Sequence, residues 1–261
     1  SGIMFARKTT TSAATLGLAC LLLSSSTAHH DPLDPSLPPS GNFELLDWKL
    51  DTPEDLDGNG IGRVVEEAEL SSGYQSPEFF YTASDGGMVF VATIAGGKTS
   101  TNTSYTRSEL REMLRRGNTR TSTKSGGNNW VFSAAPTADK NAAAGINGEL
   151  RAQLKVDHVT STGSSGQVGR VIIGQIHAKS DEPARLYYRK LPGNKRGSIY
   201  LAHEPLGRSD QYFEMIGSRS SSAPDPVDGI ALGEKFGYVI KAEGHTLTVT
   251  ITRTGKPDIS Q

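Results

Sequence analysis

The feature that most constrains the fold is a series of short strand-like segments that runs through nearly the whole chain after residue 42. Polar and apolar residues alternate within most of them, and turn-forming clusters of Gly, Ser, Asp, Asn and Pro separate one segment from the next. Helix signals are weak and predict only short helical turns near 62–70 and 227–233. We expect strands at 43–50, 78–83, 87–95, 104–115, 129–134, 147–158, 168–179, 185–190, 197–203, 211–216, 235–243 and 245–253. So many short strands predict an all-β jelly-roll sandwich of two antiparallel sheets.

The N-terminal part has a different composition. Residues 4–28 carry a charged start, an apolar stretch and a small-residue end, which is the order of a secretory signal peptide. The apolar stretch is too short for a membrane anchor, and Cys20 lies inside it, so we favour export over a lipoprotein. We therefore expect 1–28 to be a signal peptide with an upstream remnant, 29–42 a Pro-rich mobile leader, and 43–261 one domain of a secreted, monomeric protein.

Charge and cysteine content limit the functional classes. Cys20 is the only cysteine, so disulfides cannot stabilise the expected mature domain. The formal net charge of −1 argues against nucleic-acid binding, and we expect no membrane partner after signal cleavage. Two basic clusters could still guide an acidic ligand into one groove, although each could equally be an ordinary solvated edge. The clusters are Arg107, Arg111, Arg115, Arg116, Arg120 and Lys124, and Arg185, Arg189, Lys190, Lys195 and Arg196.

Several common catalytic motifs are absent. The sequence has no Glu-x-Asp-x-x-Glu pair of glycosidase carboxylates, no Gly-x-Ser-x-Gly elbow, no phosphate loop and no His-Glu-x-x-His. Residues 55–66 match the spacing of an EF-hand calcium loop, with Asp55, Asp57 and Asn59 as ligand candidates. Pro53 and a strand-like approach contradict an EF-hand, so we interpret 55–60 as a surface turn and leave a different calcium loop open.

Two short polar patterns stand out within strand-like segments, Arg-Ser-Glu-Leu-Arg at 107–111 and Gln-Ile-His at 175–177. Successive side chains of a strand point to opposite faces. Arg107, Glu109 and Arg111 therefore lie on one face of their segment, and Gln175 and His177 likewise lie on one face of theirs. A face with guanidinium, carboxylate, amide and imidazole groups suits a bound polyanion better than a hydrophobic core.

The residue types suggest proton abstraction next to a carboxylate. A lone strand histidine is usually structural, but His177 has Gln175 beside it, and imidazole titrates near neutrality as a general base requires. Arginine binds carboxylates in a fork geometry, and the Gln175 amide can bind a carboxyl oxygen without adding charge. Donors preorganised at a carboxylate stabilise the charge that develops when the neighbouring carbon loses its proton.

At these two motifs the sequence resembles the alginate lyases of polysaccharide lyase family 7, which share Arg-(Ser/Thr)-Glu-Leu-Arg and Gln-(Ile/Val)-His. The surroundings at 81–88 and 186–192 are similar too, and the resemblance covers about 43–261. It implies a jelly roll with a concave substrate groove and β-elimination of alginate to 4,5-unsaturated oligouronates. It implies no metal and no organic cofactor.

By matched position, the resemblance implies that Arg107 and Gln175 neutralise the uronate carboxylate and that His177 abstracts the C5 proton. Glu109 and Arg111 would hold the substrate, and we add Lys190 of the matching segment to the substrate-binding residues. Isoleucine at position 176 points to guluronate-containing or mixed blocks.

One family motif is missing. The family's third motif, Tyr-Phe-Lys-Ala-Gly-x-Tyr-x-Gln, carries the tyrosine thought to protonate the leaving oxygen, and it has no match here. We therefore expect the domain to be incomplete at its C-terminal side, and we assign that role to no other tyrosine. Two alternatives stay open, a non-catalytic module that binds acidic polysaccharide and a lyase for another polyuronate such as glucuronan.

Overall fold

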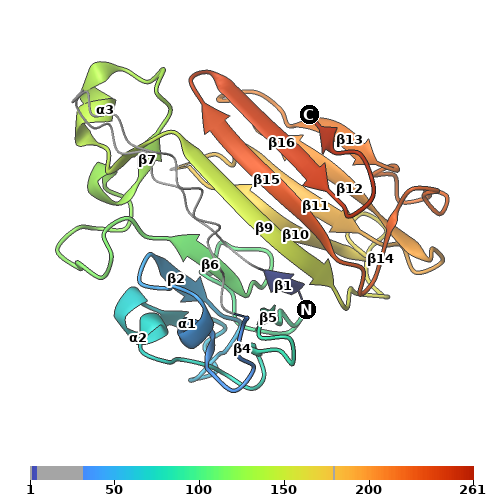
Figure 1. Ribbon diagram of the computed structural model, residues 1–261, viewed down its shortest axis with the longest axis horizontal. Helices are drawn as coiled ribbons and strands as arrows, with labels where there is room; N and C mark the ends of the chain where they lie inside the picture. Colours follow the sequence, from blue (N-terminus) through green and yellow to red (C-terminus); the bar gives the residue numbers. More distant parts are fainter. Residues whose placement is uncertain (1, 5–31, 179) are drawn as a thin grey trace, which may run out of the picture.

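The computed structural model describes residues 2–4, 32–178 and 180–261, and β-strands dominate it. The larger of its two main layers is a sheet with the strand order β17-β16-β15-β9-β1-β5-β4, antiparallel throughout (Figure 1). Its strands are β1 (Gly2–Met4), β4 (Phe80–Thr82), β5 (Met88–Phe90), β9 (Gly148–Val156), β15 (Phe236–Glu243), β16 (Thr246–Thr252) and β17 (Ile259–Ser260).

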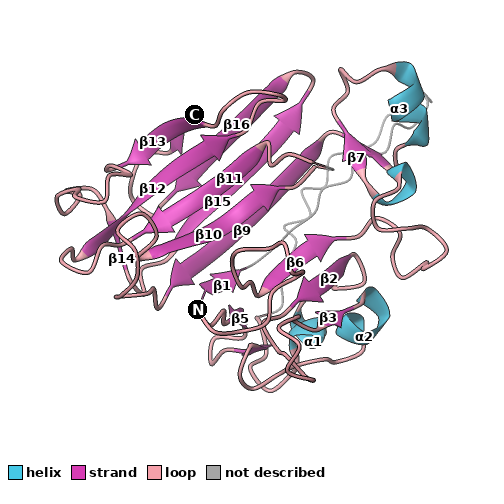
Figure 2. Ribbon diagram, turned by 180° about the vertical axis from the view of Figure 1, so that it is seen from behind, coloured by secondary structure: helices cyan, strands magenta, loops and turns pink. Residues whose placement is uncertain are grey.

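The second layer lies against β9, β15 and β16, and Figure 2 shows it from the other side. It contains the antiparallel series β10-β11-β12-β13, and β14 pairs with β12. The strands are β10 (Arg170–Ile176), β11 (Ala184–Arg189), β12 (Arg196–His203), β13 (Gln211–Ile216) and β14 (Ile230–Ala231).

Strand alternation produces the core between these layers. On β9, Ala152 and Leu154 are buried while the neighbouring Arg151 and Gln153 are exposed. They meet inward-facing residues of the opposite layer, such as Leu186 of β11, in one hydrophobic cluster. Burying an apolar side chain of this size stabilises a fold by about 1.5–3 kcal/mol. The core thus fixes which face of β10–β13 points outward.

A smaller lobe adjoins the sandwich (Figure 1). It contains an antiparallel sheet of order β3-β2-β6, and a second apolar cluster that includes Leu50, Phe80 and Leu110 lies beneath it. Its elements are α1 (Pro39–Asn42), β2 (Trp48–Asp51), β3 (Val64–Val65), α2 (Glu67–Ser71) and β6 (Glu109–Glu112). The connection from β6 to β9 holds the 3₁₀ turn η1 (Gly126–Asn128), β7 (Trp130–Val131), α3 (Thr137–Ala142) and β8 (Gly145–Ile146).

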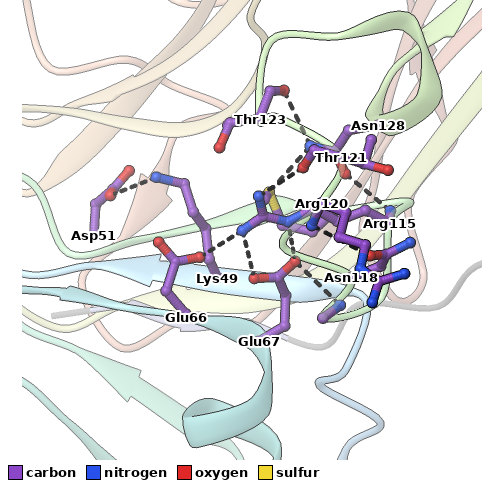
Figure 3. A network of polar contacts seen from close by, with 12 residues as sticks. Lys49, Asp51, Glu66, Glu67, Arg115, Asn118, Arg120, Thr121, Thr123 and Asn128 are labelled. Atoms are coloured by element: carbon purple, nitrogen blue, oxygen red, sulfur yellow. Dashed lines mark hydrogen bonds and ion pairs between the residues drawn. The ribbon is translucent and has the colours of Figure 1, made fainter.

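Arg115 ties the segment after β6 to α2 (Figure 3). Its guanidinium donates to both carboxylate oxygens of Glu67, at 2.7 and 3.0 Å, and to Glu66 at 2.8 Å. A third branch donates to the backbone carbonyl of Thr121 at 3.0 Å, and Asn128 accepts the Arg115 backbone N–H. Because Glu67 is fully buried, this ion pair is part of the interior of the lobe.

The all-β prediction is confirmed, with local differences. The expected strand at 104–115 is paired only at 109–112, and the predicted helical turn at 227–233 contains the short strand β14 instead. The expected turn at 62–70 corresponds to α2, which begins later, at Glu67. In the described residues, no helix has the length and hydropathy needed to cross a membrane.

The N-terminal assignments differ from the structure at two places. The leader expected to be mobile packs onto the fold from residue 32, because Pro39 is buried and the carbonyl of Leu37 accepts a hydrogen bond from Thr82. Residues 2–4 form β1 between β5 and β9, although we had assigned 1–28 to a signal peptide with an upstream remnant. The rest of the predicted signal peptide, 5–28, lies outside the described residues.

Candidate active site

β6 supplies one side of the candidate site. Leu110 is buried in the apolar cluster of the small lobe, so the alternation of the strand turns Glu109 and Arg111 to the opposite face. Arg107 lies two residues before Glu109, and its Nη1 is 3.9 Å from Glu109 Oε1. The predicted shared face of Arg107, Glu109 and Arg111 agrees with this burial pattern.

β10 supplies the other side, and a β-bulge sets its register. Pairing with β11 shifts between Ile172 and Gly174, so that Ile173 is the extra residue. The Ile173 carbonyl accepts a 2.7 Å hydrogen bond from the buried Tyr238 hydroxyl, and a Cβ on residue 174 would lie 2.4 Å from that oxygen. Glycine at 174 thus permits the bulge, after which Gln175 faces outward.

Gln175 joins the two strands. Its amide Nε2 donates to both carboxylate oxygens of Glu109, at 2.9 and 3.1 Å. Glu109 therefore contacts Arg107, which lies just before β6, and Gln175 on β10, and these two residues are 68 positions apart in the sequence. Glu109 acts as a bridge that fixes the positions of the two predicted carboxylate-binding residues.

The pKa of the Glu109 carboxyl is raised above its ordinary value. Burial of the carboxyl group raises its pKa, whereas the Arg107 guanidinium and the Gln175 amide act in the opposite direction by favouring the ionised form. The charge of His177 also favours the carboxylate. His177, Gln175, Arg107 and Glu109 are thus electrostatically coupled in one location.

His177 follows β10 directly, and its side chain is 42% exposed. Its Nδ1 lies 2.6 Å from the backbone carbonyl of Ala178, a geometry in which Nδ1 carries the proton and donates it. The neutral ring then has its lone pair on Nε2, which is the atom a general base uses. Nε2 lies 3.4 Å from a carboxylate oxygen of Glu182.

Of the other two predicted site residues, Arg111 lies near Glu109 and Lys190 lies away from it. Arg111 pairs across the strands with Lys49 of β2, two positions along β6 from Glu109 and on the same face. Lys190 follows β11 at the end where Arg189 pairs with Arg170, which is the opposite end of β10 from Gln175. Its Nζ donates to the carbonyl of Leu191 at 3.3 Å. The structure does not bring Lys190 together with the other predicted residues.

Most of the two basic clusters have structural partners. Arg115 is buried against Glu67, and Arg116 pairs with Asp47 at 2.7 Å, so the cluster at 107–124 is not one open cationic surface. In the second cluster, Arg196 pairs with Asp225, and Arg189 donates to three backbone carbonyls. The expectation that the clusters guide an acidic ligand into one groove therefore does not apply to these paired side chains.

The candidate calcium loop folds on itself. Asp55 accepts the backbone N–H groups of Asn59 and Gly60, at 3.1 and 2.8 Å, and Asp57 accepts the Asn59 side-chain amide at 2.9 Å. These contacts are those of a hydrogen-bonded surface turn. Over the described residues, the structure has no cluster of three or more His, Cys, Asp or Glu side chains arranged to hold a metal ion.

The sequence analysis missed a row of rings and guanidinium groups on the outer face of β10–β13, which we call the Tyr–Arg strip. The Tyr187 and Tyr200 rings stack at 4.8 Å, and the Tyr212 ring lies 6.5 Å from Tyr200. Arg170 lies over Tyr187 at 5.3 Å, and Arg219 over Tyr212 at 3.7 Å. The strip consists of Arg170, Tyr187, Tyr200, Tyr212 and Arg219.

The strip lies on the same face as Gln175. Gln175 pairs with Arg185 across the strands, so their side chains point to one side, and Tyr187 is two residues further along β11. Arg185 pairs with Asp210 and donates to the Tyr187 hydroxyl at 3.3 Å. The alternation of Arg185, Tyr187 and Arg189 was the available sequence signal for this face.

Comparison with known proteins agrees with this geometry. The sequence model of the family described as "Alginate lyase" matches residues 43–261. The chain belongs to the alginate lyase family. The match confirms the predicted resemblance to polysaccharide lyase family 7, and it extends over the whole predicted domain.

Individual alginate lyases are similar in sequence and structure. A curated alginate lyase of Klebsiella pneumoniae is 53% identical over 231 residues, which are 85% of this chain and 75% of that protein. The crystal structure of the alginate lyase from Klebsiella pneumoniae matches with a TM-score of 0.84 and 51% identity, over 86% of this chain and 82% of that one. An exolytic PL7 alginate lyase from Zobellia galactanivorans matches with a TM-score of 0.59 and 25% identity, over 84% and 65%.

Proposed function

We propose that this protein is a secreted lyase that cleaves alginate by β-elimination and leaves 4,5-unsaturated oligouronates. The observation that carries the proposal is the convergence of Arg107, Gln175 and His177 around the Glu109 carboxylate. Membership of the alginate lyase family and the similarity to the Klebsiella enzyme support the substrate class.

In the proposed step, Arg107 and the second amide N–H of Gln175 bind the carboxylate of the uronate to be cleaved. His177 Nε2 takes the C5 proton, the C5–H electron pair forms the C4=C5 double bond, and the C4–O bond breaks. The leaving oxygen takes up one proton from solvent water, and His177 later returns the C5 proton to solvent, so atoms and charge balance. Preorganised donors at the carboxylate stabilise the charge that develops there, which is the main obstacle to removing this proton.

Glu109 contributes to the proposed step by positioning. Its carboxylate occupies one N–H of the Gln175 amide, which fixes the side chain and directs the other N–H outward. Arg107 is 29% exposed, and its guanidinium comes no closer to Glu109 than 3.9 Å. It can therefore still bind a substrate carboxylate.

The Tyr–Arg strip fits a polymeric acidic sugar. Tyr187 and Tyr200 are buried, at 6% and 4% exposure, so their rings support the strip from below. The groups it offers to a uronate chain are the guanidinium groups of Arg170 and Arg219, which bind carboxylates, and the ring of Tyr212, which is 43% exposed. Because the strip continues the outer face beyond Arg185, a chain held at Gln175 can extend toward the Arg170 guanidinium, which lies over Tyr187. We propose that it receives uronates further along the polymer.

We also propose a preference for guluronate-containing or mixed blocks. The support is the isoleucine at 176, which packs against the core opposite Ala184. Since this side chain faces inward, it acts on preference through the placement of Gln175 and His177 on either side of it.

The test compares two products on defined polymers. A β-eliminating enzyme produces one unsaturated uronate, detected by its ultraviolet absorbance, for each new reducing end. A hydrolase produces reducing ends without the absorbance, and a binding module retains polymer and produces neither. Equal yields of both products on alginate support the proposal, faster release from polyguluronate supports the preference, and activity on glucuronan alone contradicts the substrate assignment.

A further inference from the structure

We propose that Glu182 is a positioning residue for His177: its carboxylate caps the Nε2 atom in the unliganded protein, and this contact must open before His177 can accept a substrate proton. The inference rests on the proposed function for the role of His177 as base. Glu182 makes no contact with the substrate in this proposal and acts only through His177.

The geometry occupies both nitrogens of the imidazole ring. Nδ1 lies 2.6 Å from the Ala178 carbonyl, and Nε2 lies 3.4 Å from Glu182 Oε1. A neutral ring protonated on Nδ1 would direct a lone pair at the carboxylate, and two acceptors repel each other. The contact is favourable only when a proton lies between them, either on His177 as imidazolium or on Glu182 as carboxylic acid.

The position of Glu182 is fixed from the neighbouring strand. Its backbone N–H donates to Glu204 Oε2 at 3.0 Å. The next residue, Pro183, accepts a 2.6 Å hydrogen bond from His203 at the end of β12. These two hydrogen bonds to the end of β12 hold the segment just before β11 that carries Glu182. They thereby place the Glu182 carboxylate next to His177.

The charged groups around the pair come from three other elements: Glu204 after β12, Arg185 on β11 and Glu109 on β6. Burial and a hydrogen bond to the Glu204 carboxyl raise the pKa of Glu182, while His177 and Arg185 oppose the rise.

The capped state has a consequence for pH dependence. The contact with the Glu182 carboxylate favours the imidazolium form of His177, which cannot accept the C5 proton. Replacing Glu182 with glutamine removes the charge that favours imidazolium but keeps the size of the side chain and offers an N–H to the neutral Nε2 atom. The base form then persists to lower pH.

The experiment measures kcat/KM on alginate against pH for the wild type and Glu182→Gln. We expect the acid limb of the variant to move to lower pH by about half a unit, as expected for a partly exposed ion pair, with a similar plateau above it. The matched control is Glu243→Gln, which removes one exposed carboxylate from the β15–β16 hairpin and should leave the limb in place.

A second measurement does not need turnover. NMR titration of the imidazole C–H signals, with His177 assigned by its loss in His177→Asn, should show the same shift to lower pH in Glu182→Gln. An unmoved acid limb together with an unmoved His177 titration overturns the inference. If the wild type produces no unsaturated uronate, the proposed function fails, while the NMR titration still decides whether Glu182 caps His177.

Discussion

Replacing Arg115 with methionine should destabilise the protein strongly, although Arg115 lies outside the candidate site. Arg115 is only 6% exposed, and its partner Glu67 is fully buried. Methionine keeps most of the aliphatic volume but removes the donors to Glu67, Glu66 and the Thr121 carbonyl shown in Figure 3. The Glu67 carboxylate would then remain buried without a counterion.

Breaking a buried ion pair from one side costs about 3–5 kcal/mol, because the remaining charge loses its partner but stays out of water. A typical domain has a free energy of unfolding of about 5–15 kcal/mol, so the loss is a large fraction of the total. The matched control is Arg116→Met. Arg116 is 49% exposed, so water can replace much of its contact with the largely buried Asp47, and its loss should cost much less than the loss of Arg115.

The pH dependence has a definite sign. Burial would raise the pKa of Glu67, but hydrogen bonds from Arg115 and from backbone N–H groups outweigh it and lower the pKa to about 2. A lowered pKa gives stability that is present above the unfolded value of 4.5 and is lost as the pH falls toward 2. In Arg115→Met, backbone N–H groups still oppose the effect of burial, but the guanidinium no longer does, so Glu67 takes up a proton more readily and the difference from the wild type should shrink toward about pH 4.

Urea unfolding of the three proteins, followed by tryptophan fluorescence at neutral pH and at about pH 4, measures these effects. We expect a large loss for Arg115→Met at neutral pH, a smaller loss in acid, and a small change for Arg116→Met at both. Equal losses for the two variants, or a loss for Arg115→Met that does not depend on pH, would refute the reasoning.

Two further predictions concern β10. Gly174→Ala places a Cβ 2.4 Å from the Tyr238 oxygen, so we expect the free energy of unfolding in urea to fall by about 1–3 kcal/mol and the activity to fall as well. The control is Gly193→Ala, whose Cβ would meet nothing within 4 Å and should be close to neutral. Equal losses of stability in the two variants would contradict the role of the bulge. Arg170→Ala removes the guanidinium over Tyr187, so we expect the KM for polymeric alginate to rise several-fold. We expect kcat, and the KM for the shortest oligomer that is cleaved, to stay unchanged. Equal increases in the two KM values would argue against a polymer-binding role.

Local alternation made much of the fold and site predictable from the sequence. The faces of β6 and β10 follow from the buried Leu110 and the inward Ile176, because a strand has a strict period of two. The same rule placed Glu109 with Arg111 and Gln175 away from the core. Predictions of this kind depend only on neighbouring residues, and those about the outward faces agree with the structure.

Contacts between distant segments could not be predicted. No local pattern reveals that Glu109 bridges to Gln175, that Glu182 meets His177 or that Arg115 is buried against α2. Charge counts along the chain treated Arg115 as part of an open basic cluster, because burial depends on the tertiary fold. The distance of Lys190 from Gln175 could not be predicted for the same reason, since it follows from the register of β10 and β11.

The most direct test of the central claim is the rate of unsaturated-uronate formation on alginate by the wild type and by His177→Ala, with polymer binding measured on the same samples. The account predicts that the wild type produces the ultraviolet-absorbing product and that the variant loses this activity while it retains most of its affinity for alginate, because Arg107 and Gln175 still bind the carboxylate. Product formation that survives in His177→Ala would show that His177 is not the base, and its absence from the folded wild type would contradict the proposed lyase activity.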